Sequence, residues 1–189
     1  MTLPDLQALT INDERLRGRA ADADAVRAAL AEAERALGEA RAAGDRREMA
    51  RMLGYCAEAL RLLGRETEAV SLVDEAARIA RELGDARLVR ANAIRRGELA
   101  RSAGALDLAI HLLGDALQDA RDDPDRYLVD FALQHLGKAL WNAGRAGEAV
   151  PLLEEALAIR QAGGKAGLIA STEEALAAAR ATVARDAGR

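Results

Sequence analysis

The stretch ALWNAGRAGEAVPLLEEAL, residues 139–157, decides the fold because two earlier segments of the chain repeat its pattern. Residues 59–77 read ALRLLGRETEAVSLVDEAA, and residues 99–117 read LARSAGALDLAIHLLGDAL. In each segment an Ala follows a Gly by five residues, and these glycines, Gly64, Gly104 and Gly144, are 40 residues apart. A fixed period of this length is the sequence signature of a repeat architecture.

A second series of turn residues divides each 40-residue unit into two helices. Gly44, Gly84 and Gly164 keep the same step, with Pro124 at the remaining position, and Asp follows directly at 45, 85 and 125. Gly often ends a helix and Asp often caps the next one, so the spacing predicts paired helices of about 18 residues. Small residues that would let the helices pack closely recur in phase at Ala57, Gly97, Gly137 and Ala177.

The composition agrees with an all-α protein. The chain has 189 residues, a formal net charge of -4 and an aromatic content of 2%, and it is rich in Ala, Leu, Glu and Arg. Cys56 is the only cysteine, which excludes an intramolecular disulfide, and we expect it to be buried on the packing face of its helix. The N-terminus lacks the features of a secretory signal, and no stretch resembles a membrane span, so we expect a cytoplasmic location.

The stretch HLGKALWNAGRAGEAVPLLEEALAIR, residues 135–160, resembles the tetratricopeptide repeat in its small residues Gly137, Gly144, Ala149 and Ala156. The 40-residue length is similar to the longer variant found in kinesin light chains and bacterial regulators. The resemblance covers residues 46–164 well and residues 1–21 poorly. It implies one domain, an α-α superhelix (solenoid) of helical hairpins. Its expected parts are a partial repeat at 1–44, full repeats at 45–84, 85–124 and 125–164, and a capping helix and tail at 165–189.

Two helices need separate comment. A helix at 22–43 is the well-defined part of the partial N-terminal repeat, and residues before it leave that end of the solenoid poorly sealed. Pro151 lies inside a predicted helix, where proline removes one backbone hydrogen bond. Because it falls early in the helix, we expect a slight bend rather than a break.

In the tetratricopeptide family the first helix of every repeat lines the concave wall. In the predicted helix 126–143, one stripe away from the Leu face carries polar and aromatic residues at steps of three and four. Adding the equivalent positions of the earlier repeats, the resemblance implies a ligand groove formed by Arg51, Tyr55, Glu58, Arg95, Glu98, Arg101, Tyr127, Phe131, His135, Lys138, Trp141 and Asn142. Aromatic and Arg anchors of this kind suit a peptide with apolar and acidic groups. Alternatively, Phe131 and Trp141 fill space between neighbouring helices, and the charges form intrahelical pairs.

The sequence contains no recognisable catalytic or cofactor site. His111 is expected at the surface and His135 in the groove, and neither has a companion at metal-ligand spacing. The acidic stretch 121–126, RDDPDR, lacks the ligand spacing of a calcium loop and is interpreted as a helix terminator. Phosphate-binding glycine loops and an assembled Ser/His/Asp set are also absent. We therefore expect no enzyme activity and no cofactor.

These observations predict a non-enzymatic scaffold that holds an unidentified peptide or protein segment in its concave groove. An alternative is a self-assembling homodimer in which the N-terminal edge, residues 1–30, docks on a second copy. The Lys/Asn set with which some family members clamp a peptide carboxylate is missing from the corresponding positions. Nucleic-acid binding is disfavoured because the net charge is negative and Arg alternates with acidic residues on most faces.

Overall fold

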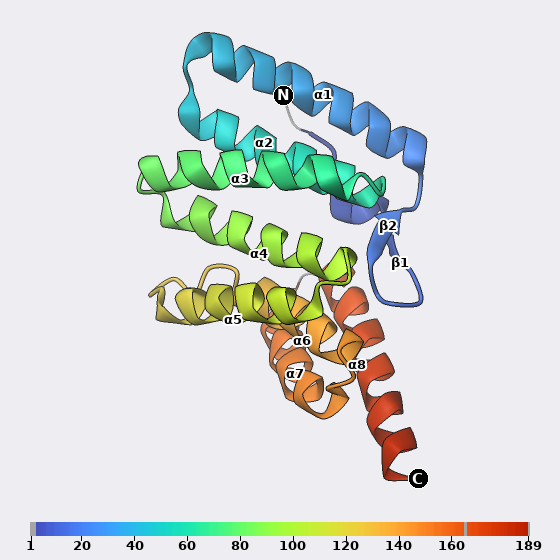
Figure 1. Ribbon diagram of the computed structural model, residues 1–189. Coiled ribbons are helices and arrows are strands. Elements are labelled where there is room, and N and C mark those ends of the chain that lie inside the picture. Colours follow the sequence, from blue (N-terminus) through green and yellow to red (C-terminus); the bar gives the residue numbers. More distant parts are fainter. Residues whose placement is uncertain (1–2, 165, 189) are drawn as a thin grey trace.

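The computed structural model describes residues 3–164 and 166–188, which form a solenoid of helices preceded by a short N-terminal segment (Figure 1). The predicted boundaries at residues 1, 165 and 189 lie outside this range. The helices are α1 (Ala23–Ala43), α2 (Arg46–Leu62), α3 (Glu66–Glu82), α4 (Ala86–Ser102), α5 (Leu106–Asp122), α6 (Val129–Asn142), α7 (Ala146–Ala162) and α8 (Ala166–Ala187). The mostly helical architecture predicted from the 40-residue period is confirmed.

The helices begin and end at the residues that the spacing indicates. The carboxylates of Asp22, Asp45 and Asp85 accept hydrogen bonds from backbone amides in the first turns of α1, α2 and α4. Every predicted turn glycine has a positive φ, for example 76° at Gly64 and 77° at Gly144. This left-handed conformation favours glycine because a Cβ would strain it.

The connection between α5 and α6 differs from the prediction. We expected a helix over 126–143, but α6 begins only at Val129, so Tyr127 lies in the preceding turn. Pro124 occupies the place of a turn glycine and its φ cannot become positive. The chain instead turns through Arg126 and Leu128, with φ of 50° and 67°, and the turn lengthens at the expense of the first helical residues.

Each helix packs on the next, and the first helices of successive units, α2, α4, α6 and α8, also contact one another. They form the inner, concave row, while α1, α3, α5 and α7 form the outer row. Close packing depends on small residues: a Cβ on Gly97 would lie 2.5 Å from Leu113, and one on Gly137 would lie 2.7 Å from Leu153. Helix α7 runs without interruption through Pro151, as expected.

The N-terminal segment, defined here as residues 3–20, has no counterpart in the other repeats. It contains a 3-10 helix, η1 (Leu6–Leu9), and two antiparallel strands, β1 (Thr10–Asn12) and β2 (Gly18–Ala20). Leu6 packs into the core around α1–α3, and Leu16 packs into the core around α4–α8. The segment therefore takes the place of a first helix before α1 and links the two halves of the solenoid.

Candidate ligand site on the concave face

The N-terminal segment lies against the concave face and is held there by side chains of the first helices. Arg101 on α4, only 2% exposed, donates hydrogen bonds to the backbone carbonyl oxygens of Arg15 (3.2 Å) and Leu16 (3.1 Å). The side-chain amide of Asn142 on α6 donates to the same Arg15 carbonyl at 3.1 Å. These donors satisfy backbone groups that form no regular ladder at the tip of the hairpin.

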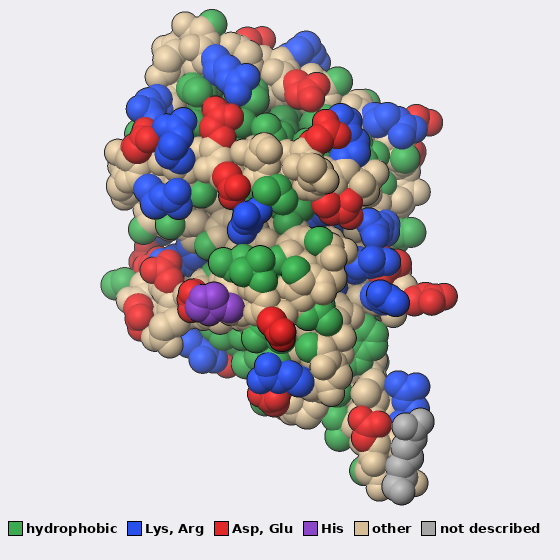
Figure 2. Space-filling view, viewed as in Figure 1, with side chains coloured by type: hydrophobic (Ala, Val, Ile, Leu, Met, Phe, Trp, Pro, Cys, Tyr) green, Lys and Arg blue, Asp and Glu red, His purple; other side chains and the backbone are tan. Residues whose placement is uncertain are grey.

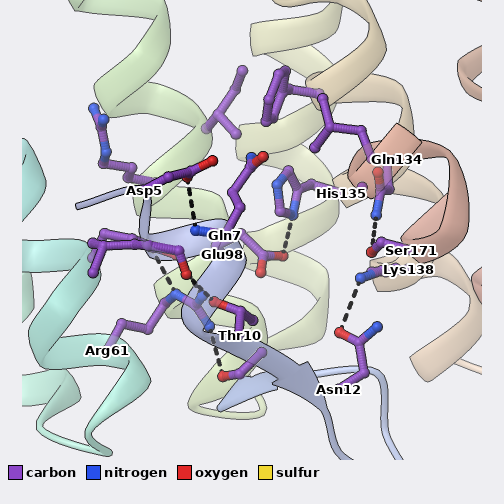
Figure 3. Close-up of a pocket in the computed structure, with 18 of the residues that line it drawn as sticks. Asp5, Gln7, Thr10, Asn12, Arg61, Glu98, Gln134, His135, Lys138 and Ser171 are labelled. Atoms are coloured by element: carbon purple, nitrogen blue, oxygen red, sulfur yellow. Dashed lines mark hydrogen bonds and ion pairs between the residues drawn. The ribbon is translucent and has the colours of Figure 1, made fainter. Parts of the chain in front are cut away.

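The same pattern continues along α2 and α6. The hydroxyl of Tyr55 donates to the carbonyl oxygen of Pro4 at 2.7 Å, and Arg61 donates to that of Gly18 at 3.2 Å. Lys138 donates to the side-chain oxygen of Asn12 at 3.3 Å, and Figure 3 shows the two side chains pointing toward each other. Most of these contacts address the backbone of the segment rather than its side chains.

The hairpin tip is fixed by Asp13 and by a strained leucine. One carboxylate oxygen of Asp13 accepts from the amides of Arg15 (2.9 Å) and Arg17 (3.0 Å). Leu16 has a φ of 55°, which is uncommon for a residue with a branched side chain. Burial of the Leu16 side chain, 4% exposed, and its contact with Arg101 hold this conformation in place.

Between the segment and the first helices lies a cavity of about 770 Å³. This volume falls within the range of small-molecule sites. Its walls come from the N-terminal segment and from α2, α4, α6 and α8, and ten of the lining residues are labelled in Figure 3. The larger side chains of its helical wall include Tyr55, Glu58, Arg61, Arg95, Glu98, Phe131, Gln134, His135, Lys138 and Glu174.

In the first two repeats, the charged residues of the cavity wall neutralise each other. Glu58 pairs with Arg61 at 2.6 Å, and Glu98 pairs with Arg101 at 2.7 Å, each across three residues of one helix. Burial alone would raise the pKa of Glu98, but Arg101 and His135 hold it well below its usual range. Nδ1 of His135 lies 2.8 Å from the Glu98 carboxylate, and the two side chains face each other in Figure 3.

The third repeat breaks this pairing. At the positions of the Glu–Arg pairs it carries Lys138 and Trp141, 40 residues after Glu98 and Arg101. Lys138 is 4% exposed, and among the described residues no carboxylate lies within 4.0 Å of its ammonium group. Burial and the nearby charge of Arg101 lower the pKa of Lys138 to about 8.

Helix α8 completes the wall with residues that the sequence analysis did not select. Arg160 on α7, 1% exposed, pairs with Asp130 at 3.0 Å and donates to Thr172 at 2.7 Å. Its guanidinium also lies over the Phe131 ring, 5.0 Å from the centroid. Extending the 40-residue step beyond α6 would have identified this wall, because Glu174 follows Gln134 by one period.

The predicted groove residues fall into three groups. Eight of the twelve line the cavity: Tyr55, Glu58, Arg95, Glu98, Tyr127, Phe131, His135 and Lys138. Arg101 and Asn142 bind the N-terminal segment instead. Arg51 lies outside the cavity, with its side chain 60% exposed and 3.3 Å from Glu48. Trp141 also lies outside it and packs toward α8, where its indole nitrogen donates to Thr182 at 3.1 Å.

The remaining expectations concern single residues and the surface. Cys56 is buried, and burial raises its pKa to about 11; the His111 side chain is 72% exposed. Both placements are as predicted. Within residues 3–164 and 166–188 no cluster of three His, Cys, Asp or Glu side chains could hold a metal ion, and none of the helices combines the length and apolar character needed to cross a membrane. Figure 2 shows basic and acidic side chains interspersed over one face.

Comparison with known proteins identifies the fold. No protein-family model and no curated protein sequence matches the chain. A Podosopora anserina protein with nearly identical TPR-like repeats, assigned to the kinesin light chains, matches in a glutamine-to-methionine variant with a TM-score of 0.61 and 18% identity, covering 86% of this chain and 80% of that one. A second crystal structure with the same description gives 0.56 and 19%, covering 86% and 89%.

A de novo designed helical repeat protein matches with a TM-score of 0.51 and 18% identity, covering 86% of this chain and 91% of that one. Identities this low speak to the arrangement of helices and not to a shared ligand. The chain therefore has a TPR-like helical-repeat fold, as the small-residue frame of residues 135–160 predicts.

Proposed function

We propose that the protein is a non-enzymatic scaffold whose concave face binds an extended peptide or protein segment. The observation that carries this proposal is the mode in which residues 3–20 are bound. Arg101 donates to two backbone carbonyl groups of the segment, and Tyr55 and Arg61 to one each. Donors aimed at backbone carbonyls hold an extended chain with little regard to its sequence, and pockets for its side chains then add selectivity.

The chemistry of the client follows from the groove that would receive it. Buried leucine positions, such as that of Leu16, favour an apolar anchor in the client. Lys138 and Arg95 favour an acidic group nearby. Because the segment already occupies these positions, a client has to displace it or bind beside it, and its apparent affinity falls accordingly.

The proposal is tested with a random peptide library displayed on phage and panned against the full chain. We expect enriched peptides that combine an apolar and an acidic residue. Their binding, measured by calorimetry, should weaken at least about tenfold in Arg101→Met and stay within about twofold in the control Arg51→Met. Failure to enrich any sequence, or equal binding by the two variants, would contradict a peptide-binding concave face.

A further inference from the structure

The cavity under the N-terminal segment carries an excess of positive charge that arises in the third repeat. Glu58 and Glu98 are each neutralised by an Arg three residues later, but the next position in this series is Lys138. Trp141, which stands where an Arg would follow, turns toward Thr182 on α8. The ammonium group of Lys138 is left with one hydrogen bond, to Asn12, for its three donors.

A second cation lines the same cavity. Arg95 donates one hydrogen bond, to the side-chain oxygen of Asn92 at 3.2 Å, and no carboxylate of the described residues lies within 4.0 Å of its guanidinium. Burial lowers the pKa of Arg95, which indicates that its charge is poorly compensated. Buried cations are normally paired, so two incompletely paired ones in one cavity indicate a missing anion.

The acidic residues near Lys138 are already engaged. Glu98 is bound by Arg101 and contacted by His135. Glu174 accepts a hydrogen bond from Asn12. These contacts leave Lys138 and Arg95 as the free cationic donors among the described lining residues.

The rest of the lining is apolar and aromatic on one side. Phe131, Ile94 and Leu128 line the cavity together with the Tyr127 ring. Arg87 stacks on Tyr127 at 5.0 Å and Arg160 on Phe131 at 5.0 Å. A ligand with an apolar or aromatic group beside its charge would bury that group here.

We infer that this cavity binds a small organic carboxylate with an apolar or aromatic group, its charge held by Lys138 with Arg95 as a second donor, and its apolar part against Phe131. Residues of the N-terminal segment, including Leu6 and Thr10, form part of the wall. The site is therefore complete only with the segment in place, which selects a small molecule over a polypeptide. This inference goes beyond the proposed scaffold function and does not depend on it.

The test is calorimetric titration of the full chain with benzoate, phenylacetate and 3-phenylpropionate, each paired with its neutral amide. We expect at least one carboxylate to bind with a Kd below about 1 mM, and its amide to bind at least about tenfold more weakly. Lys138→Met should weaken carboxylate binding at least about tenfold, and Arg51→Met should leave it unchanged. Circular dichroism checks that both variants are folded.

A second readout concerns protons. At pH 9 most Lys138 side chains in the free protein are neutral, because the pKa is about 8. Binding of a carboxylate should therefore take up close to one proton, measured from the buffer dependence of the binding heat, and Lys138→Met should abolish the uptake.

Three results would overturn the inference. One is that none of the carboxylates binds at about 10 mM. Another is that carboxylates and amides bind equally, and the third is that Lys138→Met binds as the wild type does. Binding of acidic peptides without binding of small carboxylates would also overturn it, yet would leave the proposed scaffold function standing.

Discussion

The guanidinium of Arg101 donates a 3.1 Å hydrogen bond to the backbone carbonyl of Leu16, which lies 85 residues earlier in the chain. This contact joins the middle repeat to a segment outside the repeat pattern. The same guanidinium neutralises Glu98 inside the concave face, at 2.7 Å. Arg101 therefore holds the segment and balances the charge of the cavity wall at once.

Substitution Arg101→Met is expected to destabilise the protein strongly. It leaves Glu98, 4% exposed, without its main counter-charge and frees two backbone carbonyls of the segment. Breaking a buried pair by removing one partner costs about 3 kcal/mol or more. Urea unfolding measures the loss, and Arg51→Met, at an exposed position, is expected to change stability by less than about 0.5 kcal/mol. Equal stabilities for the two variants would contradict the role assigned to Arg101.

The stability of the protein should rise with pH above 8 because of Lys138. Its pKa is lowered from 10.5 to about 8 in the folded chain, so the unfolded chain binds more protons between these values. The free energy of unfolding then increases as pH rises from about 8 to about 10.5, by up to about 3 kcal/mol. Urea unfolding of the wild type and Lys138→Met at pH 7.5 and 10 isolates this contribution. Parallel pH dependence in the two proteins would show that Lys138 is not buried as described.

Two glycines in helices should respond to alanine with opposite signs. A Cβ on Gly137 would lie 2.7 Å from Leu153, so Gly137→Ala should destabilise by about 1–3 kcal/mol. Gly38 on α1 has no atom within 4 Å of the added Cβ, and alanine there should stabilise by about 0.5–1 kcal/mol. Thermal or urea unfolding of both variants measures the difference, and a stable Gly137→Ala protein would argue against close α6–α7 packing.

Trp141 should matter for α8 and not for the cavity. Its indole donates to Thr182, and its ring packs in the core that α8 shares. Trp141→Ala should lower stability by about 1–3 kcal/mol while carboxylate affinity stays within about twofold. Calorimetry and thermal unfolding of the variant separate the two effects. A loss of affinity comparable to that of Lys138→Met would place Trp141 in the ligand site after all.

The repeat geometry could be predicted from the sequence because its determinants are local and periodic. The turn glycines and the Asp caps recur every 40 residues, and each acts within a few residues of its own position. The same period predicted eight of the cavity residues, since a helix face is fixed by steps of three and four. The late start of α6 was missed because the effect of Pro124 passes to a longer turn that no motif marks.

The N-terminal segment could not be predicted in the same way. Residues 3–20 follow no period, and their partners lie far along the chain, as with Asn142 and Arg15. A stripe on one helix also cannot reveal which neighbour covers each side chain. Phe131 and Trp141 belong to one predicted stripe, yet the first lines the cavity and the second packs beneath α8.

The central claim is that the concave face binds an extended polypeptide, and it can be measured directly with the segment supplied separately. A fluorescent peptide of residues 1–21 is titrated into a chain that begins at Asp22, after circular dichroism has shown that its helices persist. Fluorescence anisotropy should give a Kd of about 100 µM or tighter for the native peptide. The peptide with Leu16→Asp should bind at least about tenfold more weakly, because Leu16 is 4% exposed in the intact chain. Absence of binding by the native peptide to a folded chain, or equal binding of both peptides, would contradict the account.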